Sequence, residues 1–232
     1  MISLNQTGNP VQRIGLFGGT FNPIHIGHVR VAQDALQQFN FDQIHLIPCA
    51  LPPHKIHGAL APAKDRVAMA RLALKDQSAI TVSTVETDRP GPSFTVDTLK
   101  TFKGVLDEKA ALYFLTGVDA FLEIHTWKSY AKLFDLAAFV VMSRPTTDNS
   151  PLSLSPSFAL NYIHRHISDS YALADQGQAL VHPKKKTIYL AQVTPIAVAS
   201  SQIRDRLRVG EPIHQWVDPA VSEYIDEKGL YR

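Results

Sequence analysis

Cysteine, net charge and long apolar runs are all scarce in this sequence. Cys49 is the only cysteine among 232 residues, so no intramolecular disulfide can form and a reducing compartment is expected. The 23 basic and 21 acidic residues leave a formal net charge of +2, too small for a broad surface that attracts nucleic acid or membrane. No apolar run approaches a membrane span, and residues 1–10 lack the apolar core of a secretory signal. We therefore expect a cytoplasmic protein that binds neither nucleic acid nor membrane.

The remaining composition is that of a globular α/β protein. Apolar residues make up 45% of the chain and charged residues 19%, which is enough for a sizeable core. Apolar strands alternate with helices, and this order predicts a Rossmann-like, doubly wound and mainly parallel sheet with helices on both faces. Strands are predicted at 13–17, 44–47, 80–85, 111–115, 138–142 and 188–193, and helices at 28–39, 63–74, 95–106, 200–209 and 219–226.

The length favours a single domain over 1–232, with an insertion or mobile loop at 146–186. The start of that segment, Thr146 to Pro156, is rich in Ser, Thr, Asn and Pro. Its remainder looks weakly helical and ends in the basic run 184–186, which we expect on the solvated surface. Oligomeric state and regulation cannot be read from the sequence.

Polar and glycine residues follow the predicted strands, where each strand ends. Because the carboxyl ends of parallel strands share one edge of a sheet, ligands bind there. We expect the residues after the strands to gather at that edge. They are Gly18, Pro48 to Lys55, Gly117, Asp119, Arg144 and Ser200 to Arg204.

The segment 18–28 reads Gly-Gly-Thr-Phe-Asn-Pro-Ile-His-Ile-Gly-His. Gly18 and Gly19 let the backbone approach a ligand and expose N–H groups. The helix that follows points its positive end into the same space, and His25 and His28 can share one side of its first turn. The spacing matches neither a P-loop nor G-x-G-x-x-G. Two histidines alone would suit one structural and one exposed residue, but the combination predicts an anion site.

This long motif resembles the signature of the nucleotidyltransferase superfamily with the His-x-Gly-His motif. Within it, the chain resembles the bacterial nicotinate mononucleotide adenylyltransferases. The resemblance runs from Ile14 to Leu230, except for 146–186. It implies that His25 and His28 bind the phosphates of ATP and stabilise the charge that develops during transfer. Gly18, Gly19 and Thr20 would line the same pocket.

A second motif lies at 198–204, Val-Ala-Ser-Ser-Gln-Ile-Arg. Serines at a helix start can cap the helix and offer hydroxyls to an anion, and an arginine one turn later can bind phosphate oxygens. The segment is similar to the family motif Ile-Ser-Ser-Thr-x-Ile-Arg, from which it departs at Val198, Ala199 and Ser201. The resemblance implies ATP-binding roles for Ser200 and Ser201 and a catalytic role for Arg204. An ordinary capped helix with a surface arginine is the alternative.

A third motif, Gly117-Val118-Asp119 followed by Trp127-Lys128, resembles another family pattern. A carboxylate after a strand can accept from two ribose hydroxyls, and an indole can stack on a pyridine ring. The resemblance implies that Gly117 and Asp119 bind ATP, with Asp119 on the adenosine ribose, and that Trp127 lies near the nicotinate ring. The alternatives are a helix N-cap for Asp119 and a core position for Trp127.

The remaining acceptor-binding candidates are Lys55, Phe94, Thr95 and Arg144. Lys55 ends a proline-stiffened segment, Pro-Pro-His-Lys, which would also suit a rigid surface turn. Ser93 and Thr95 are cap candidates for the next helix. The resemblance assigns Thr95 to the nicotinate carboxylate, Lys55 to the reacting phosphates and Arg144 to a supporting role.

Taken together, the resemblance implies adenylyl transfer from ATP to nicotinate mononucleotide, which gives deamido-NAD and pyrophosphate. Cys49 lies outside the clustered motifs, so direct in-line attack is expected rather than a covalent intermediate. Mg²⁺ would arrive with ATP, since the sequence has no cluster of metal-ligating side chains and His25 with His28 lack further zinc ligands. The alternatives are nicotinamide mononucleotide or phosphopantetheine as the acceptor, or a non-catalytic nucleotide-binding sensor.

Overall fold

The computed structural model describes residues 11–51, 60–142, 144–145, 151–152 and 154–232. Among these residues, eight strands form one sheet in the order β3-β2-β1-β4-β5-β10-β9-β8. The strands are β1 Arg13–Gly19, β2 Gln43–Pro48, β3 Ile80–Val82, β4 Ala111–Gly117, β5 Ala138–Met142, β8 Ala172–Ala174, β9 Ala179–Val181 and β10 Ile188–Ala191. The short strands β6 Arg144–Pro145 and β7 Pro151–Leu152 form a separate antiparallel pair.

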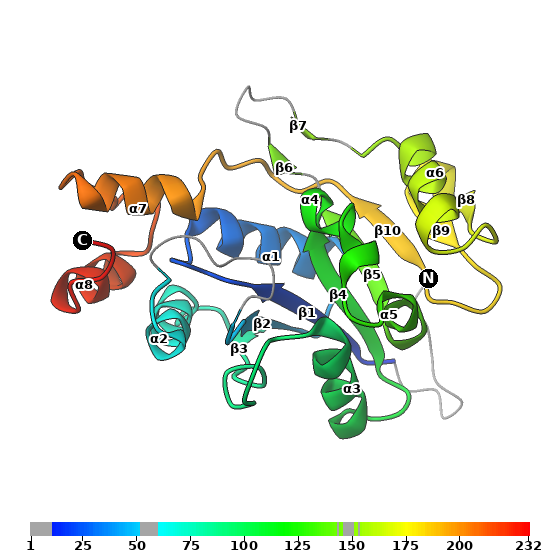
Figure 1. Ribbon diagram of the computed structural model, residues 1–232, viewed down its shortest axis with the longest axis horizontal. Helices are drawn as coiled ribbons and strands as arrows, with labels where there is room; N and C mark the ends of the chain where they lie inside the picture. Colours follow the sequence, from blue (N-terminus) through cyan, green and yellow to red (C-terminus); the bar gives the residue numbers. More distant parts are fainter. Residues whose placement is uncertain (1–10, 52–59, 143, 146–150, 153) are drawn as a thin grey trace.

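Helices fill the connections between the strands. They are α1 Ile26–Gln38, α2 Ala63–Ala73, α3 Thr95–Val105, α4 Val118–Phe121, α5 Tyr130–Leu136, α6 Pro156–His166, α7 Ser200–Arg208 and α8 Pro219–Glu227, with 3₁₀ turns η1 Ile124–Thr126 and η2 Asp175–Gly177. In Figure 1, α7 and α8 lie at one end of the molecule, and α6 with β8 and β9 at the other. No helix in the described part of the chain is long and apolar enough to cross a membrane.

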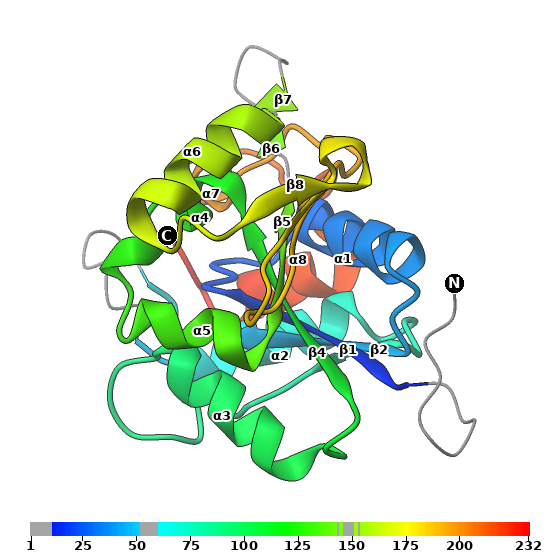
Figure 2. The same cartoon turned by 90° about the vertical axis from the view of Figure 1, so that its right-hand side faces the viewer.

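The sheet has two buried faces because its central strands alternate apolar residues between them. On β4, Tyr113 and Leu115 pack on one face, with residues of α1, α2, α7 and α8. Leu112 and Phe114 pack on the other, with residues of α3, α4, α5 and α6. Figure 2 shows α1 on one side of β1, β2 and β4, and α3 with α5 on the other.

Six strands run parallel in the order β3-β2-β1-β4-β5-β10. The mainly parallel, doubly wound fold predicted from the sequence is therefore confirmed. The strand order reverses between β1 and β4, and such a switch point leaves a crevice at the carboxyl ends of the strands. The segments that follow Gly19 and Gly117 begin at this crevice.

The segment 146–186 differs from its expectation. It holds α6, but it also contributes β9, which pairs antiparallel with β10, and β8, which pairs antiparallel with β9, so that both extend the sheet. Each of these strands has three residues, too few for a readable alternation. The basic run is only partly solvated, because the half-buried Lys185 places Nζ 2.8 Å from Asp135 Oδ1. The third strand also stops at Val82, before the predicted Val85.

Candidate active site

The end of β1, where the loop 20–25 begins, is tightly packed at Gly18 and Gly19. A Cβ atom on Gly19 would lie 2.7 Å from Cζ of Phe21, and one on Gly18 would lie 3.2 Å from Cζ of Phe114. A side chain at Gly19 would therefore displace the Phe21 ring. The sequence assigned these glycines to ligand approach, and the structure gives them a second role in the packing of the loop itself.

Phe21 adopts an unusual backbone conformation within this loop. Its φ is +47°, in the left-handed region that bulky residues rarely occupy. Its ring is buried, with ring centroids 5.6 Å from Phe17 and 5.0 Å from His28 in edge-to-face contacts. The Phe21 ring thus forms a wall against which the imidazole of His28 packs.

His25 and His28 lie together at the start of α1. His25 is the extended residue that precedes the helix, and His28 is its third helical residue. The two rings are stacked with centroids 3.7 Å apart. His28 Nδ1 accepts a hydrogen bond from the His25 backbone N–H at 3.3 Å. Because Nδ1 is an acceptor, the proton of the neutral ring lies on Nε2, which is thereby the nitrogen able to donate to an anion.

Helix α7 joins the same loop from the far end of the sequence. Ser200 Oγ donates to the carbonyl of Pro23 at 2.9 Å, and Arg204 Nη1 donates to the carbonyl of Asn22 at 2.8 Å. Nε of Arg204 is buried and has no hydrogen-bond partner within the described residues. The guanidinium therefore lies against the loop that carries both histidines, and Ser201 is exposed.

The predicted serine cap of α7 is wrong. Ala199 precedes the helix, and its N–H donates to Gln202 Oε1 at 3.0 Å. The Ser200 hydroxyl is instead committed to Pro23, because the loop after β1 presents a backbone carbonyl at that point. Ser200 thus links α7 to the loop after β1 instead of capping its own helix.

Arg66 on α2 was missed by the sequence analysis. The residue is fully buried, and its guanidinium donates to the carbonyls of Thr20 at 2.8 Å, Ala50 at 3.0 Å and Ala61 at 3.0 Å. It thus links the loop after β1 to the segment after β2. The spacing could have revealed it: Arg66 lies three and four positions before Met69 and Ala70, so it shares the buried face of the helix with them.

Cys49 lies beside this guanidinium, with Sγ 3.9 Å from Arg66 Nη1. Burial raises the pKa of the Cys49 thiol, and the charge of Arg66 opposes that effect without cancelling it. A thiol that stays protonated at neutral pH is a poor nucleophile. The environment of Cys49 thus agrees with a reaction that has no cysteine intermediate.

The predicted caps of α3 are also wrong. Phe94 precedes the helix and no side chain caps it. Ser93 is buried, and its Oγ accepts from the backbone N–H of Ala50 at 2.9 Å. Ser93 therefore holds the segment after β2 against the start of α3. Thr95, the first residue of the helix, is half-buried beside it.

Trp127 follows η1 and is half-buried, packed against the core. Its ring meets that of Phe114 edge to face at 6.1 Å. The neighbouring Lys128 places Nζ 4.4 Å from the centre of the Phe94 ring and 3.0 Å from Asp97 Oδ2. Lys128 therefore joins this segment to the start of α3, and the Phe114 ring contacts Trp127 and also lies close to Gly18.

Gly117 is the last residue of β4, and Asp119 follows it in α4. Gly117 pairs with Met142 at the end of β5 and supplies the residue before α4. The N-cap alternative for Asp119 is therefore wrong, because Asp119 lies inside the first turn of α4 and is exposed. Asp119 thus follows the carboxyl end of β4, which pairs with β1, the strand that precedes the histidine loop.

Two predicted site residues lie beyond this description. Lys55 belongs to 52–59, outside the described residues, and only the backbone of Arg144 is described, at the start of β6. Within the described ranges, no group of three or more His, Cys, Asp or Glu residues could hold a metal ion.

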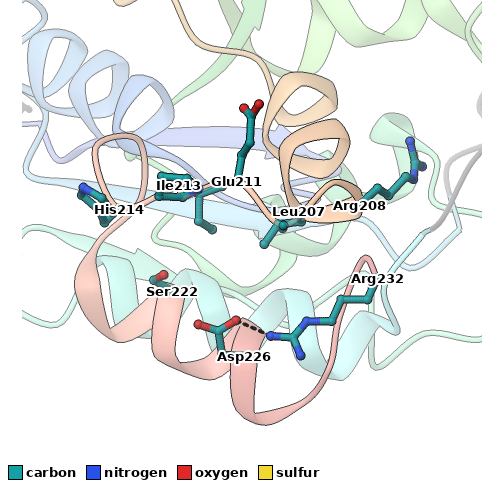
Figure 3. A pocket seen from close by; sticks show the side chains of 10 residues that line it. Leu207, Arg208, Glu211, Ile213, His214, Ser222, Asp226 and Arg232 are labelled. Atoms are coloured by element: carbon teal, nitrogen blue, oxygen red, sulfur yellow. Dashed lines mark hydrogen bonds and ion pairs between the residues drawn. The ribbon is translucent and has the colours of Figure 1, made fainter.

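A cavity of about 550 Å³ lies elsewhere, between the end of α7, α8 and the last residue of the chain (Figure 3). Leu207, Ile213 and Ser222 are among its lining residues, together with an ion pair between Asp226 and Arg232. None of the predicted site residues lines it. The candidate site is therefore the crevice edge of the sheet and not this cavity.

Comparison with known proteins defines the class first. The model of the cytidylyltransferase-like family matches residues 16–206. A solved nicotinic acid mononucleotide adenylyltransferase of Plasmodium falciparum, complexed with NaAD, shares the fold with a TM-score of 0.69. It is 22% identical in sequence, over 95% of this chain and 97% of that one.

Closer relatives identify the group. A probable nicotinate-nucleotide adenylyltransferase of Desulfatibacillum aliphaticivorans is 40% identical over 94% of this chain and 99% of its own length. One from Thermus thermophilus is 35% identical over 95% of this chain and 100% of its own length. The chain therefore belongs to the nicotinate-nucleotide adenylyltransferases, a family of nucleotidyltransferase enzymes.

Proposed function

We propose that this enzyme transfers the adenylyl group of ATP to nicotinate mononucleotide, giving deamido-NAD and pyrophosphate. The observation that carries the proposal is the stacked pair His25 and His28 at the positive end of α1, with Arg204 bonded to the same loop. Backbone N–H groups, two imidazoles and a guanidinium together suit a triphosphate. The family membership supports the same reaction.

In the proposed reaction, an oxygen of the acceptor 5′-phosphate attacks the α-phosphorus of ATP in line. The bond from that phosphorus to the bridging oxygen breaks, and pyrophosphate leaves. The attacking phosphate is already ionised at neutral pH, so no strong base is needed. His28 donates from Nε2, and Arg204 with His25 stabilises the charge on the phosphates. Catalysis then rests on positioning and on preorganised donors.

ATP enters as its magnesium complex. In that complex, phosphate oxygens and water would hold the ion. Gly18, Gly19 and Thr20 surround the triphosphate, Ser200 and Ser201 line its far side, and Gly117 with Asp119 binds the adenosine ribose. The site lies in one domain over 1–232, in which 146–186 is an insertion. The cytoplasmic location stays a prediction.

The acceptor occupies the neighbouring space. Trp127 stacks on the pyridine ring, and the start of α3 at Thr95, beside Phe94, holds the nicotinate carboxylate. Lys55 and Arg144 supply positive charge to the acceptor phosphate. What supports this half is the contact of Trp127 with Phe114, and the placement of the neighbouring Lys128 against Phe94 and Asp97.

The test is an acceptor panel. Full-length protein is mixed with ATP, Mg²⁺ and one of nicotinate mononucleotide, nicotinamide mononucleotide or phosphopantetheine, and pyrophosphate release is measured. We expect the highest kcat/KM with nicotinate mononucleotide. A higher value with either other acceptor overturns the proposed substrate. ATP binding without pyrophosphate release from any of the three would instead show a sensor.

A further inference from the structure

Tyr231, the penultimate residue of the chain, reaches the loop that carries the histidines. Its hydroxyl donates to Oδ1 of Asn22 at 2.8 Å. Asn22 directly follows Phe21, and the same Oδ1 also accepts the backbone N–H of Ala61 at 3.0 Å. Tyr231 and Asn22 are both buried, so this contact is shielded from water.

The position of Asn22 matters because the loop around it is strained. Phe21 has a positive φ, a conformation that persists only where surrounding contacts hold it. Those contacts come from separate parts of the chain. Arg66 donates to the carbonyl of Thr20. Arg204 donates to the carbonyl of Asn22, and Tyr231 donates to the side chain of Asn22.

The backbone that follows α8 brings the Tyr231 hydroxyl to Asn22. After α8 the chain turns through Gly229 and Tyr231, which both have positive φ, +58° and +67°. Arg232 then pairs with Asp226 on α8 at 2.6 Å, as the dashed line in Figure 3 shows. A tyrosine in the left-handed region is uncommon, and here its side chain is buried against the phosphate loop.

The hydroxyl remains a donor at neutral pH. Burial raises the pKa of Tyr231 above its ordinary value, although the charges of Arg66 and Arg204 act to lower it. These are the same two arginines that bind the loop.

We propose that Tyr231 is a positioning residue for adenylyl transfer, whose hydrogen bond to Asn22 fixes the loop 18–28 in the shape that binds the phosphates of ATP. The inference rests on the proposed function for the identity of the bound anion. It assigns to the C-terminal end of the chain a part in substrate binding that its place in the sequence does not suggest.

The test compares Tyr231→Phe with Tyr224→Phe in the full chain. Tyr224 lies on α8 and donates to Asp65 Oδ1 on α2 at 2.8 Å, so the control removes a tyrosine hydroxyl whose partner is outside the loop 18–28. Affinity for a non-hydrolysable ATP analogue is measured by calorimetry, and hydrogen exchange is measured over 18–28. Tyr231→Phe is expected to weaken analogue binding about three- to tenfold, the range for one neutral hydrogen bond, and to speed exchange in the loop.

Tyr224→Phe should lower Tm but leave the affinity for the analogue and the hydrogen exchange over 18–28 unchanged. Unchanged analogue affinity in Tyr231→Phe overturns the inference, whatever happens to Tm, because the tyrosine would then serve stability alone. Equal losses of affinity in both variants overturn it as well. Analogue binding needs no acceptor, so the two proposals fail separately. A wild-type protein that binds the analogue and yet transfers nothing to nicotinate mononucleotide contradicts only the proposed function.

Discussion

The two halves of the candidate site are held in different ways. The phosphate half is bound from several distant segments, because Arg66, Arg204 and Tyr231 all donate to the short stretch between Thr20 and Asn22. The acceptor half is held by fewer contacts, chiefly the aromatic contact of Trp127 with Phe114 and the ion pair of Lys128 with Asp97. A loop fixed by this many hydrogen bonds holds its phosphate-binding groups in place before the substrate arrives, and electrostatic catalysis depends on such preorganisation. The acceptor half would govern substrate choice.

The largest expected effect lies in the phosphate half. His28→Ala removes the donor proposed for the developing charge, so kcat for pyrophosphate release at saturating substrates should fall about 10²- to 10³-fold. His214→Ala is the matched control, since His214 is exposed beside the cavity of Figure 3. Undiminished turnover in a folded His28→Ala variant would rule out the proposed role of His28 as a donor to the developing charge.

Arg66→Lys tests the link between the two loops. Lysine cannot reach three carbonyls in the geometry of a guanidinium, so the free energy of unfolding should fall by about 2–4 kcal/mol and Tm by roughly 5–15 °C. Calorimetry measures both. Arg71→Lys is the control, because Arg71 is exposed on the same helix. Equal Tm values for the two variants would contradict a special role for Arg66.

In the acceptor half, Trp127→Leu should raise KM for nicotinate mononucleotide about two- to tenfold, the range for one aromatic pair. KM for ATP should change less, since Trp127 is proposed to touch only the acceptor. The chain offers a control in its other tryptophan, Trp216, which packs on Arg206. A larger rise in KM for ATP than for the acceptor in Trp127→Leu would show that the halves are assigned the wrong way round.

The smallest effect is expected at Cys49. Cys49→Ala should keep kcat within about twofold, because burial holds the pKa of the thiol above its ordinary value and leaves it protonated. Alkylation of the folded wild type at pH 8 should be slow for the same reason. Loss of turnover in Cys49→Ala, or a covalent adenylyl-cysteine in the wild type, would overturn direct transfer.

The contrast between the halves also shows how far the sequence could be read. The long strands and helices of the sheet were predicted to within a few residues, because their apolar periodicity reports local structure directly. Strands β8 and β9 were missed, because strands of three residues carry no readable period. The caps at Ser93 and Ser200 were wrong because each hydroxyl binds a distant segment instead of its own helix.

What the sequence by itself determined is therefore the local chemistry. It placed the glycines at the end of the first strand, His25 and His28 beyond them and an arginine one turn into α7, since each of these depends only on neighbours in the chain. Only the tertiary structure decided what holds that chemistry in place. The buried Arg66 and the terminal Tyr231 meet the loop across long stretches of sequence. Side-chain hydrogen bonds of this kind leave no periodic trace, because they join residues that packing alone brings together.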